Sequence, residues 1–377
     1  MTHTSPLLEN HQDREAALLP YGTPALSALV VETFGEPEIE YAAIRKGAGV
    51  IDLPHRGVIR VGGEERLEFL NRMVTQELKG ATPGTSVNAF WINRKGRIDA
   101  DLRVIVRDED VLLELDMLCV AKTIETLDAL IIADDVTLED ATESLHRLGV
   151  HGPRAIELLR AAGVELGDIA SNENRTIDGL TIDRRDATGE VGLDLIVPAD
   201  RVRGLYETIG AAIDERAELK AKRIGWSAFN TARIEAGSPL FNLDFGEKSL
   251  PAETGVLNDR VSFTKGCYPG QEVVARMRSL GGPKQSLVAL AFEDPGDPTL
   301  QPATGDAVTL RGEEKPIGAI TSSTRSPMRS DAIVCLAQVK TAHAGPGTEL
   351  DVHSRGVVLR ATVREGLVAW QPAGSGA

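Results

Sequence analysis

The stretch Lys265-Gly266-Cys267-Tyr268-Pro269-Gly270-Gln271-Glu272 places one thiol in a glycine-rich loop directly before a helical apolar pattern. Pro269 fits a first helical position, and Gly266 and Gly270 allow backbone angles or close approaches that a side chain would forbid. Lys265 and the helix N-terminus both place positive potential near Cys267, which favours its thiolate. The stretch therefore predicts either a reactive cysteine or a tight turn that carries an inert one.

The surroundings of this stretch are basic, although the chain as a whole is acidic. The 377 residues carry a formal net charge of −15 at pH 7, which argues against non-specific nucleic-acid binding because phosphate binding needs clustered cations. In residues 260–284, five cations stand against the single acid Glu272, a local balance of +4. The cations are Arg260, Lys265, Arg276, Arg278 and Lys284. A positive pocket of this kind suits a small anionic ligand, and a solvated basic face is the alternative.

The other cysteines lie in a different setting. The chain has three cysteines and no C-x-x-C pair, which predicts neither a disulfide scaffold nor a metal site. Cys119 and Cys335 lie in apolar runs and are expected to be small core residues. Cys267 is therefore the candidate catalytic thiol. Charged residues precede any apolar run at the N-terminus, which predicts neither a signal peptide nor a membrane span and favours the cytoplasm.

The length of the chain predicts two or three domains. Residues 1–44 are mixed and turn-rich, and we expect a surface arm there. Strand and helix patterns over 45–283 form two α+β units, roughly 45–140 and 141–283, with a ferredoxin-like order. Residues 284–370 contain short strand candidates separated by turns, which predict a small antiparallel β-barrel or sandwich. Residues 371–377 resemble a loose tail.

Three shorter stretches of the sequence predict individual helices and strands. Apolar residues over 67–78 recur at spacings of three and four, which predicts an amphipathic helix. Residues 87–93 and 98–106 predict two strands joined by a hairpin at Asn93–Gly96. Residues 222–236 predict a helix that Gly237 ends.

The stretch 265–272 resembles the signature K-G-C-Y-x-G-Q-E of the YgfZ group, folate-binding relatives of the glycine cleavage T-protein, which is an aminomethyltransferase. Other segments resemble the T-protein family itself. Residues 148–155 are similar to its short strand that leads into a G-P-x-A helix start, and residues 188–194 to its T-G-E-x-G-[FY]-E segment. Residues 232–237 resemble its A-R-x-E-x-G helix, and residues 318–327 its G-x-x-T-S…S-P segment.

The resemblance covers roughly residues 45–365 and implies an α+β fold. That fold is the three-domain cloverleaf of the T-protein, with two α+β units and a C-terminal antiparallel β-barrel around a central folate channel. The implied cofactor is tetrahydrofolate or a one-carbon derivative, whose pterin offers an amide edge and an exocyclic amine to a carboxylate. The pattern does not choose between Glu190 and Asp194 for that carboxylate. Arg233 or Arg276 would provide a guanidinium group that pairs with the carboxylates of the folate's glutamate tail. The full set of cofactor-binding candidates is Glu190, Asp194, Arg233, Lys265, Tyr268, Gln271 and Arg276.

One strand departs from the aminomethyltransferase pattern. In those enzymes a G-x-[IL]-x-D-D-L strand supplies a carboxylate near the reactive nitrogens of the folate, where it can stabilise positive charge or relay a proton. The corresponding segment, Gly96–Leu102, is G-R-I-D-A-D-L, so Ala100 replaces one acid and Asp101 keeps the place of the other. Strand alternation puts Asp99 and Asp101 on one face. Asp101 is therefore a second catalytic candidate, and an exposed strand acid is the alternative.

Three functions fit these observations. The first is a folate-dependent accessory protein of the YgfZ type, which the resemblance links to the maintenance of iron–sulfur enzymes, including one that modifies tRNA; such enzymes would be its partners. The alternative is a tetrahydrofolate-dependent aminomethyltransferase or demethylase of the T-protein type. A folate-binding interaction scaffold is the third. The cysteine signature favours the first, whereas Asp101 and the T-G-E-x-G segment support the second.

Overall fold

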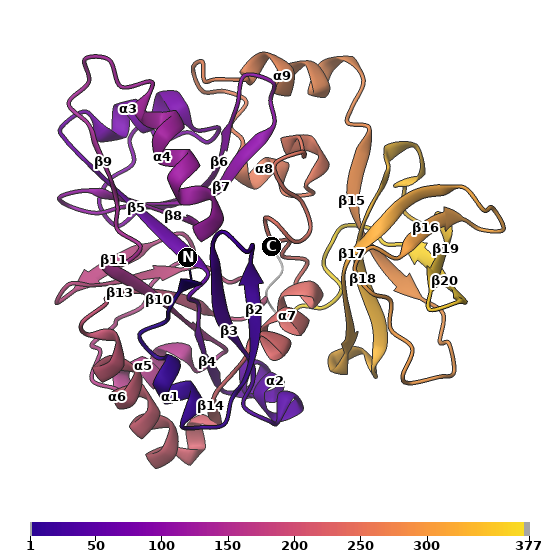
Figure 1. Cartoon of the computed structure of the whole chain (residues 1–377), viewed down its shortest axis with the longest axis horizontal. Helices are drawn as coiled ribbons and strands as arrows, with labels where there is room; N and C mark the ends of the chain where they lie inside the picture. Colours follow the sequence, from indigo (N-terminus) through magenta and orange to yellow (C-terminus); the bar gives the residue numbers. More distant parts are fainter. Residues whose placement is uncertain (1, 373–377) are drawn as a thin grey trace. The chain divides into compact units, whose positions relative to one another are not determined.

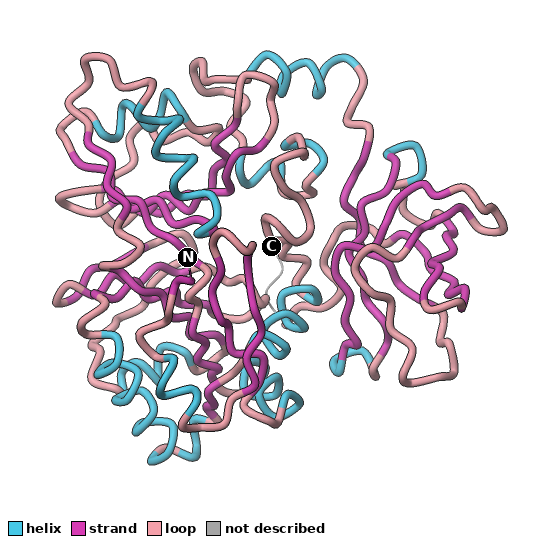
Figure 2. Tube along the Cα trace, in the orientation of Figure 1, coloured by secondary structure: helices cyan, strands magenta, loops and turns pink. Residues whose placement is uncertain are grey.

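The computed structural model describes residues 2–372 and divides the chain into two compact units (Figure 1). Unit 1 comprises Met1–Trp91 and Ala100–Phe229, and unit 2 comprises Ile92–Asp99 and Asn230–Ala377. Figure 2 traces the strands of both units in magenta. In the described part of the chain, every helix is too short or too polar to cross a lipid bilayer.

The first half of unit 1 is a five-stranded sheet with the order β6-β7-β8-β5-β9. Its strands are β5 (Arg56–Gly62), β6 (Ser86–Ile92), β7 (Ile98–Val106), β8 (Val111–Asp116) and β9 (Thr137–Asp140). Two helices accompany it, α3 (Arg66–Met73) and α4 (Val120–Asp128). The helix expected over 67–78 ends at Met73 because Val74 takes an extended conformation, with φ −88° and ψ 163°.

The second half of unit 1 is a six-stranded sheet with the order β11-β12-β13-β10-β4-β14. Its strands are β4 (Ala48–Asp52), β10 (Leu145–His151), β11 (Asn174–Ile177), β12 (Leu180–Arg184), β13 (Gly192–Pro198) and β14 (Ala221–Arg223). Helices α5 (Ala155–Ala161) and α6 (Val202–Glu215) share one apolar core with this sheet. The helix expected over 222–236 begins later, as α7 (Trp226–Glu235), because residues 221–223 pair in parallel with β4.

The N-terminal segment differs from the surface arm expected over residues 1–44. It forms a three-stranded sheet and two helices: β1 (Thr2–His3), α1 (Leu8–Gln12), β2 (Ala17–Gly22), β3 (Ser27–Thr33) and α2 (Pro37–Lys46). Leu7 belongs to the core of the six-stranded sheet. The polar side chains of Ser5 and His11 are also buried, since their Oγ and Nε2 atoms lie 2.6 and 2.8 Å from Asp52 Oδ2. The polar composition of this segment suggested an exposed arm. The sequence did not reveal that Asp52, about 40 residues later, is the buried partner of His11.

Unit 2 contains the β-barrel that the strand pattern predicts. The barrel is closed, with the order β15-β18-β17-β16-β19-β20. Its strands are β15 (Gln285–Phe292), β16 (Ala307–Leu310), β17 (Pro316–Ser326), β18 (Ala332–Lys340), β19 (Glu349–Ser354) and β20 (Val357–Val363). The sequence prediction missed β19. The α+β class, with two sheet-and-helix halves followed by an antiparallel barrel, is confirmed.

Unit 2 also includes the tip of the β6–β7 hairpin, residues 92–99. The backbone N–H of Ile98 donates to the carbonyl of Ser249 at 3.1 Å. Gly96 has φ +73°, and a Cβ atom there would lie 2.8 Å from Val273 Cγ1 in helix α9 (Gln271–Leu280). A side chain at this position would therefore be strained and would also clash. The short helix α8 (Leu257–Arg260) precedes α9 in the same unit.

Candidate functional site

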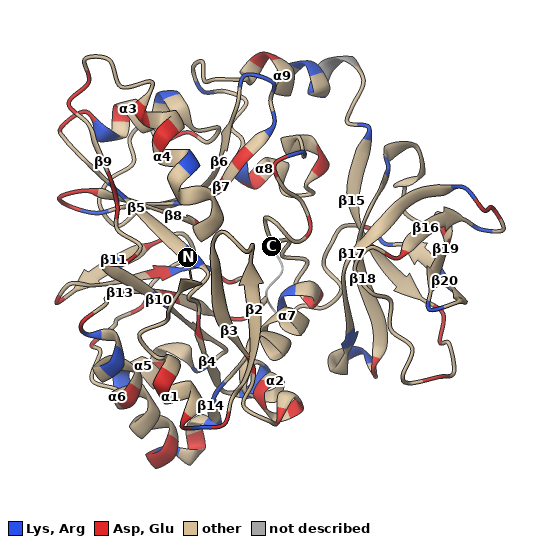
Figure 3. Ribbon diagram, in the orientation of Figure 1, with Lys and Arg blue, Asp and Glu red and all other residues tan. Residues whose placement is uncertain are grey.

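Unit 1 holds a group of mostly buried charged side chains that connects its two larger sheets. Figure 3 marks the Lys, Arg, Asp and Glu residues along the chain. We call this group the ionic cluster; it consists of Arg56, Arg103, Glu114, Arg147, Asp183, Arg185 and Asp194. The strand registers bring its members together: Arg103 lies opposite Glu114 on β7 and β8, and Asp183 lies opposite Asp194 on β12 and β13. Buried charges are stable only when paired, so the cluster constrains how the two sheets meet.

Arg103 and Asp183 form a bidentate pair within the cluster. Arg103 Nε and Nη2 donate to the two carboxylate oxygens of Asp183, both at 2.8 Å, and Nη1 donates to Asn172 Oδ1 at 2.7 Å. This planar fork fixes direction as well as distance. It joins β7 to β12 two residues beyond Asp101, so it sets the position of that part of β7.

Asp194 is a buried carboxylate of the ionic cluster that two arginines share. It is 3% exposed and pairs with Arg147 and with Arg185, whose Nε lies 3.2 Å from Asp194 Oδ2. Burial alone would raise the pKa of Asp194, but the charges of Arg147 and Arg185 outweigh it and lower that pKa. Asp194 is therefore a permanently ionised acceptor at neutral pH.

Glu190 lies in the turn that leads into β13. Its Oε1 atom is 3.9 Å from Arg45 Nη1, and the same Arg45 nitrogen donates to the carbonyl of Thr188 at 2.7 Å. Burial raises the pKa of Glu190, with Arg45 opposing the shift. Glu190 is thus a loosely paired carboxylate that retains its charge less firmly than Asp194 does.

The two acids of β7 differ in their burial. Asp99 is buried, and Asn93 Nδ2 donates to its Oδ1 at 3.2 Å. Asp101 is partly buried, and Ala100 between them is completely buried. Asp99 is therefore not an exposed strand acid, whereas Asp101 keeps part of its surface accessible.

The loop 265–272 forms a turn before α9 rather than the expected start of the helix at Pro269. The N–H of Gln271 donates to the carbonyl of Tyr268 at 3.2 Å, and Gly270 has φ +78° and ψ 0°. Pro269 and Gly270 thus take the central positions of a type II turn, where glycine is needed. A Cβ at Gly270 would lie 2.5 Å from the carbonyl oxygen of Asn93. Gly266 has open space around its Cα, so only Gly270 permits a close approach.

The side chains of this loop separate into buried and exposed groups. Lys265 and Tyr268 are buried, with Lys265 Nζ 5.4 Å from the centre of the Tyr268 ring. Burial raises the pKa of Tyr268 to about 12. Gln271 Nε2 donates to the carbonyl of Gly266 at 3.4 Å, and Arg276 pairs with Glu272 on the exposed face of α9 at 2.7 Å. Cys267 is exposed.

We expect Cys267 to react first with a limiting thiol reagent, because Cys119 and Cys335 are buried. Burial also raises the pKa of Cys335 to about 12, which removes its thiolate at neutral pH. Alkylation followed by peptide mass spectrometry measures the order of labelling. Earlier labelling of Cys119 or Cys335 would show that the exposed loop does not hold the reactive sulfur.

Arg233 lies in a separate polar network in unit 2. It is 1% exposed, pairs with Asp244, and donates to Ser322 Oγ at 2.6 Å and to Asn230 Oδ1 at 2.9 Å. Ser322 in turn donates to Asp244 Oδ1 at 2.6 Å. The donors of Arg233 are thus engaged within the protein, and the network ties α7 to barrel strand β17. Burial lowers the pKa of Arg233.

Sequence reasoning did not select Glu114, Arg147, Arg185 or His151, although the chain contains a signal for some of them. Glu114 and Arg147 interrupt strands that are otherwise largely apolar. A charge on the buried face of a strand requires a partner, and each of these residues is the partner of the other. His151 closes β10 and is buried as well.

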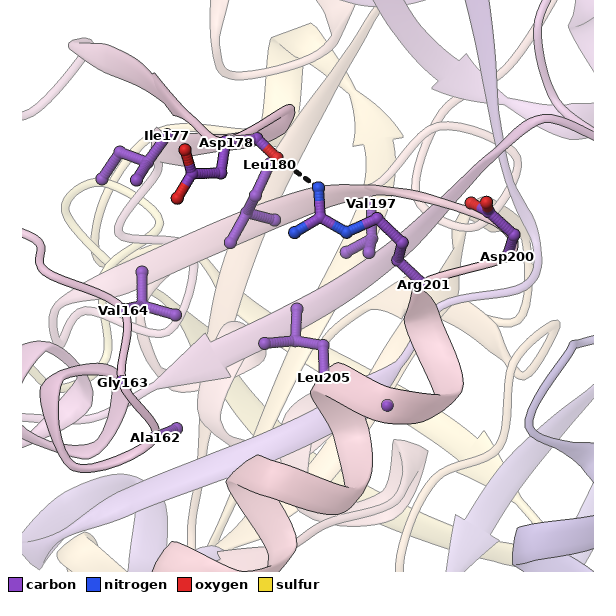
Figure 4. Close-up of a pocket in the computed structure, with 11 residues that line it drawn as sticks. Ala162, Gly163, Val164, Ile177, Asp178, Leu180, Val197, Asp200, Arg201 and Leu205 are labelled. Carbon is purple, nitrogen blue, oxygen red and sulfur yellow. Dashed lines mark hydrogen bonds between the residues drawn. The ribbon is translucent and has the colours of Figure 1, made fainter.

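A pocket of about 420 Å³ lies at the start of α6, between that helix and strands β12 and β13 (Figure 4). Its walls are mostly aliphatic, and Arg201 extends across it to donate to the backbone carbonyl of Asp178. None of the predicted site residues lines this pocket. Within residues 2–372, no three His, Cys, Asp or Glu side chains are grouped so that they could hold a metal ion.

Comparisons with known proteins agree with this architecture. The GCVT N-terminal domain model matches residues 16–265, and the glycine cleavage T-protein C-terminal barrel domain model matches residues 285–367. An aminomethyltransferase of Symbiobacterium thermophilum is 29% identical over 377 residues, which cover 96% of each chain. An aminomethyltransferase of Shouchella clausii is 30% identical over 367 residues, 95% of each chain.

A solved structure supports the same fold. The crystal structure of glycine cleavage system aminomethyltransferase T from Bartonella henselae superposes with a TM-score of 0.85 over 98% of both chains, at 21% identity. The T-protein fold expected from the sequence is therefore confirmed. Because the first model alone covers well over half of the chain, and the barrel model follows it in order, this protein belongs to the glycine cleavage T-protein family.

Proposed function

We propose that this protein binds tetrahydrofolate, or a one-carbon derivative of it, and transfers an aminomethyl-type one-carbon unit. The observation that carries the proposal is the match to proteins named aminomethyltransferase along nearly the whole chain, including both the N-terminal domain and the barrel. The family resemblance of residues 188–194 and 232–237 points to the same ligand.

The ionic cluster supports a pterin site at Asp194. A reduced pterin offers an N–H and an exocyclic amine on one edge, and an ionised carboxylate can accept both hydrogen bonds in parallel. Arg147 and Arg185 keep Asp194 ionised, whereas burial raises the pKa of Glu190. We therefore assign the pterin contact to Asp194 and a neighbouring role to Glu190. Arg233 acts as a positioning residue in this proposal because its donors are already engaged.

Asp101 is the proposed catalytic acid of β7. As a one-carbon unit moves to a folate nitrogen, positive charge develops there, and a nearby carboxylate can stabilise that charge or relay a proton. The Arg103–Asp183 fork fixes β7 two residues from Asp101. The tetrahydrofolate itself supplies the nitrogen that accepts the carbon.

Exposure of Cys267 in its K-G-C-Y-x-G-Q-E loop favours a second candidate function. In this alternative the protein is a folate-dependent accessory factor of the YgfZ type that acts on iron–sulfur enzymes. Lys265, Tyr268, Gln271 and Arg276 would then present the thiol to folate or to a client protein. One cysteine cannot hold a cluster alone, so a partner would have to supply the other ligands.

A transfer assay separates the two candidates. The reactants are a carrier protein with a reduced dihydrolipoyl group, ammonia and methylene-tetrahydrofolate. The dihydrolipoyl thiol takes up the methylene carbon and ammonia as an aminomethyl group, tetrahydrofolate is released, and the measured product is the aminomethylated carrier. Turnover supports the transferase function. Clear binding of tetrahydrofolate without turnover supports the accessory function instead.

We expect Asp101→Asn to lower turnover in this assay by about 10²-fold or more, because general acid–base and electrostatic groups contribute on that scale. Affinity for tetrahydrofolate, measured by calorimetry, should change far less. Asp108→Asn is the matched control, since Asp108 is an exposed acid just beyond the same strand. Equal turnover in wild type and Asp101→Asn would remove Asp101 from the mechanism.

A further inference from the structure

His151 is a buried polar side chain that the fold leaves without a partner. It is 1% exposed, and neither ring nitrogen has a hydrogen-bond partner among residues 2–372. Burial, reinforced by the charges of Arg185 and Arg147 against that of Asp194, lowers the pKa of His151 to about 4. The ring is therefore neutral at pH 7 and carries one N–H donor and one acceptor. An unmatched donor in the interior is destabilising, and such groups call for a reason.

The position of His151 places this unmatched group beside Asp194. In the ladder between β10 and β13, His151 lies opposite Gly192, and Gly149 lies opposite Asp194. The imidazole covers both glycines: a Cβ at Gly149 would lie 2.7 Å from Nε2, and one at Gly192 would lie 3.0 Å from Nδ1. The two glycines thus leave the space that the ring occupies, next to the carboxylate. Phe229 packs near the ring at a centroid distance of 5.1 Å.

The charges of the ionic cluster do not cancel. Arg103 has its own carboxylate in Asp183, which leaves three arginines to share Glu114 and Asp194. Burial, together with the like charges of Arg185 and Arg56, lowers the pKa of Arg147 to about 9. The seven residues therefore carry one positive charge in excess.

Arg185 is the arginine best placed to meet a ligand. Its side chain is 25% exposed, the most of the three that share the two carboxylates. Its nitrogens lie 3.2 Å from Asp194 Oδ2 and 3.6 Å from Glu114 Oε2, and both of those acids already pair with Arg147. Removing Arg185 would thus leave both acids paired.

We propose that His151 and Arg185 read the pterin ring beside Asp194, an inference that rests on the proposed binding of a reduced folate. Asp194 accepts from the N3–H and the exocyclic amine. Arg185 donates to the neighbouring C4 carbonyl oxygen, which gives the excess positive charge an electron-rich partner. One ring nitrogen of His151 can meet the edge at the other side of the exocyclic amine, where it either donates to N1 or accepts from N8–H.

This assignment predicts opposite effects on stability and on binding. Arg185→Gln removes the excess charge, and His151→Phe removes the unmatched nitrogens while it keeps a ring of similar shape. Both variants are expected to have a thermal midpoint equal to or above that of the wild type. Both should lose affinity for tetrahydrofolate by about 10- to 100-fold, the usual scale for one hydrogen bond to a charged or buried group. Substitution of a residue with a purely structural role would instead lower the thermal midpoint and leave the affinity for tetrahydrofolate unchanged.

The neighbouring Arg184 provides a matched control. It donates to the carbonyl of Ile169 at 2.7 Å and pairs with Asp186 at 3.1 Å, outside the ionic cluster. Arg184→Gln removes the same charge one residue away, so its affinity for tetrahydrofolate should equal that of the wild type.

Calorimetry on the full chain tests the inference with three probes: tetrahydrofolate, 6-methyltetrahydropterin as the pterin alone, and p-aminobenzoylglutamate as the tail alone. Affinity for the first two probes should fall in Arg185→Gln and in His151→Phe, with affinity for the tail unchanged. If the wild type binds tetrahydrofolate and both variants bind it equally well, the inference is overturned and the proposed function stands. A wild type that does not bind tetrahydrofolate overturns the proposed function, and this inference with it.

Discussion

Replacing Asp194 with asparagine is expected to lower the free energy of unfolding by about 3–5 kcal/mol, the usual effect of removing one partner from a buried ion pair. Arg147 would keep its charge in the interior while one of its two carboxylates is lost. Urea denaturation of the full chain at pH 7 measures the difference. The same variant should bind tetrahydrofolate too weakly to detect, because the amide cannot accept both pterin hydrogen bonds.

The control for this variant is Asp200→Asn. Asp200 is exposed two residues beyond the end of β13, so its substitution should change stability by less than about 0.5 kcal/mol. If Asp194→Asn were as harmless as this control, the ion pairs around Asp194 would contribute nothing to the fold.

The effect of Asp194→Asn should also depend on pH in one direction. The pKa of Asp194 in the folded protein lies below its value in the unfolded chain, which is about 3.9. The stability that its charge contributes is therefore fully present above about pH 5, and it is lost as the pH falls through the folded pKa. The difference between wild type and variant should be constant from pH 6 to pH 8 and shrink in acid, as far as the folded state can be followed.

The second large effect is expected at Arg233. Arg233→Ala should lower the free energy of unfolding by about 3–5 kcal/mol, because it leaves the buried carboxylate of Asp244 without its cation. Asp244→Ala should cost a similar amount, and the double variant should cost much less than the sum, since the two residues share one network. Denaturation of the four proteins forms a double-mutant cycle that measures this coupling.

A surface arginine of the same unit supplies the comparison. The Arg360 side chain is 65% exposed and pairs with Glu293 at 3.8 Å, so Arg360→Ala should cost less than about 1 kcal/mol. Binding of tetrahydrofolate distinguishes positioning from contact. A positioning role predicts that Asp244→Ala weakens binding as much as Arg233→Ala does. Weakened binding in Arg233→Ala alone, with stability unchanged, would show that Arg233 contacts the ligand directly.

The sequence predicted those parts of the fold that follow from apolar periodicity. Apart from β19, the barrel strands appear where the sequence pattern predicts strands, and so do β10 and β13. The N-terminal sheet was missed because its short strands have mixed composition and depend on a partner, Asp52, that lies in a later strand. Local pattern cannot identify such a partner.

The family motifs in the sequence point to candidate site residues. They do not indicate which charged side chains surround those residues. Asp194 was selected from a motif, but the motif does not indicate that Arg147 pairs with it and also with Glu114 of the other sheet. In the cysteine loop, the separation of Cys267 from the two buried cysteines was predicted correctly. The helix expected to begin at Pro269 begins two residues later, at Gln271, since proline fits both the first residue of a helix and the second residue of a β-turn.

The hairpin tip that belongs to unit 2 has a consequence for how the protein is made. Residues 92–99 leave the ribosome long before their partners, since Arg97 and Lys248, which are hydrogen-bonded in the finished protein, are separated by 151 positions. The hairpin tip therefore cannot reach its final packing until residues beyond 230 have been synthesised. A fragment that starts at residue 230 would lack the strand end that Ser249 binds. Unit 2 is therefore incomplete in such a fragment.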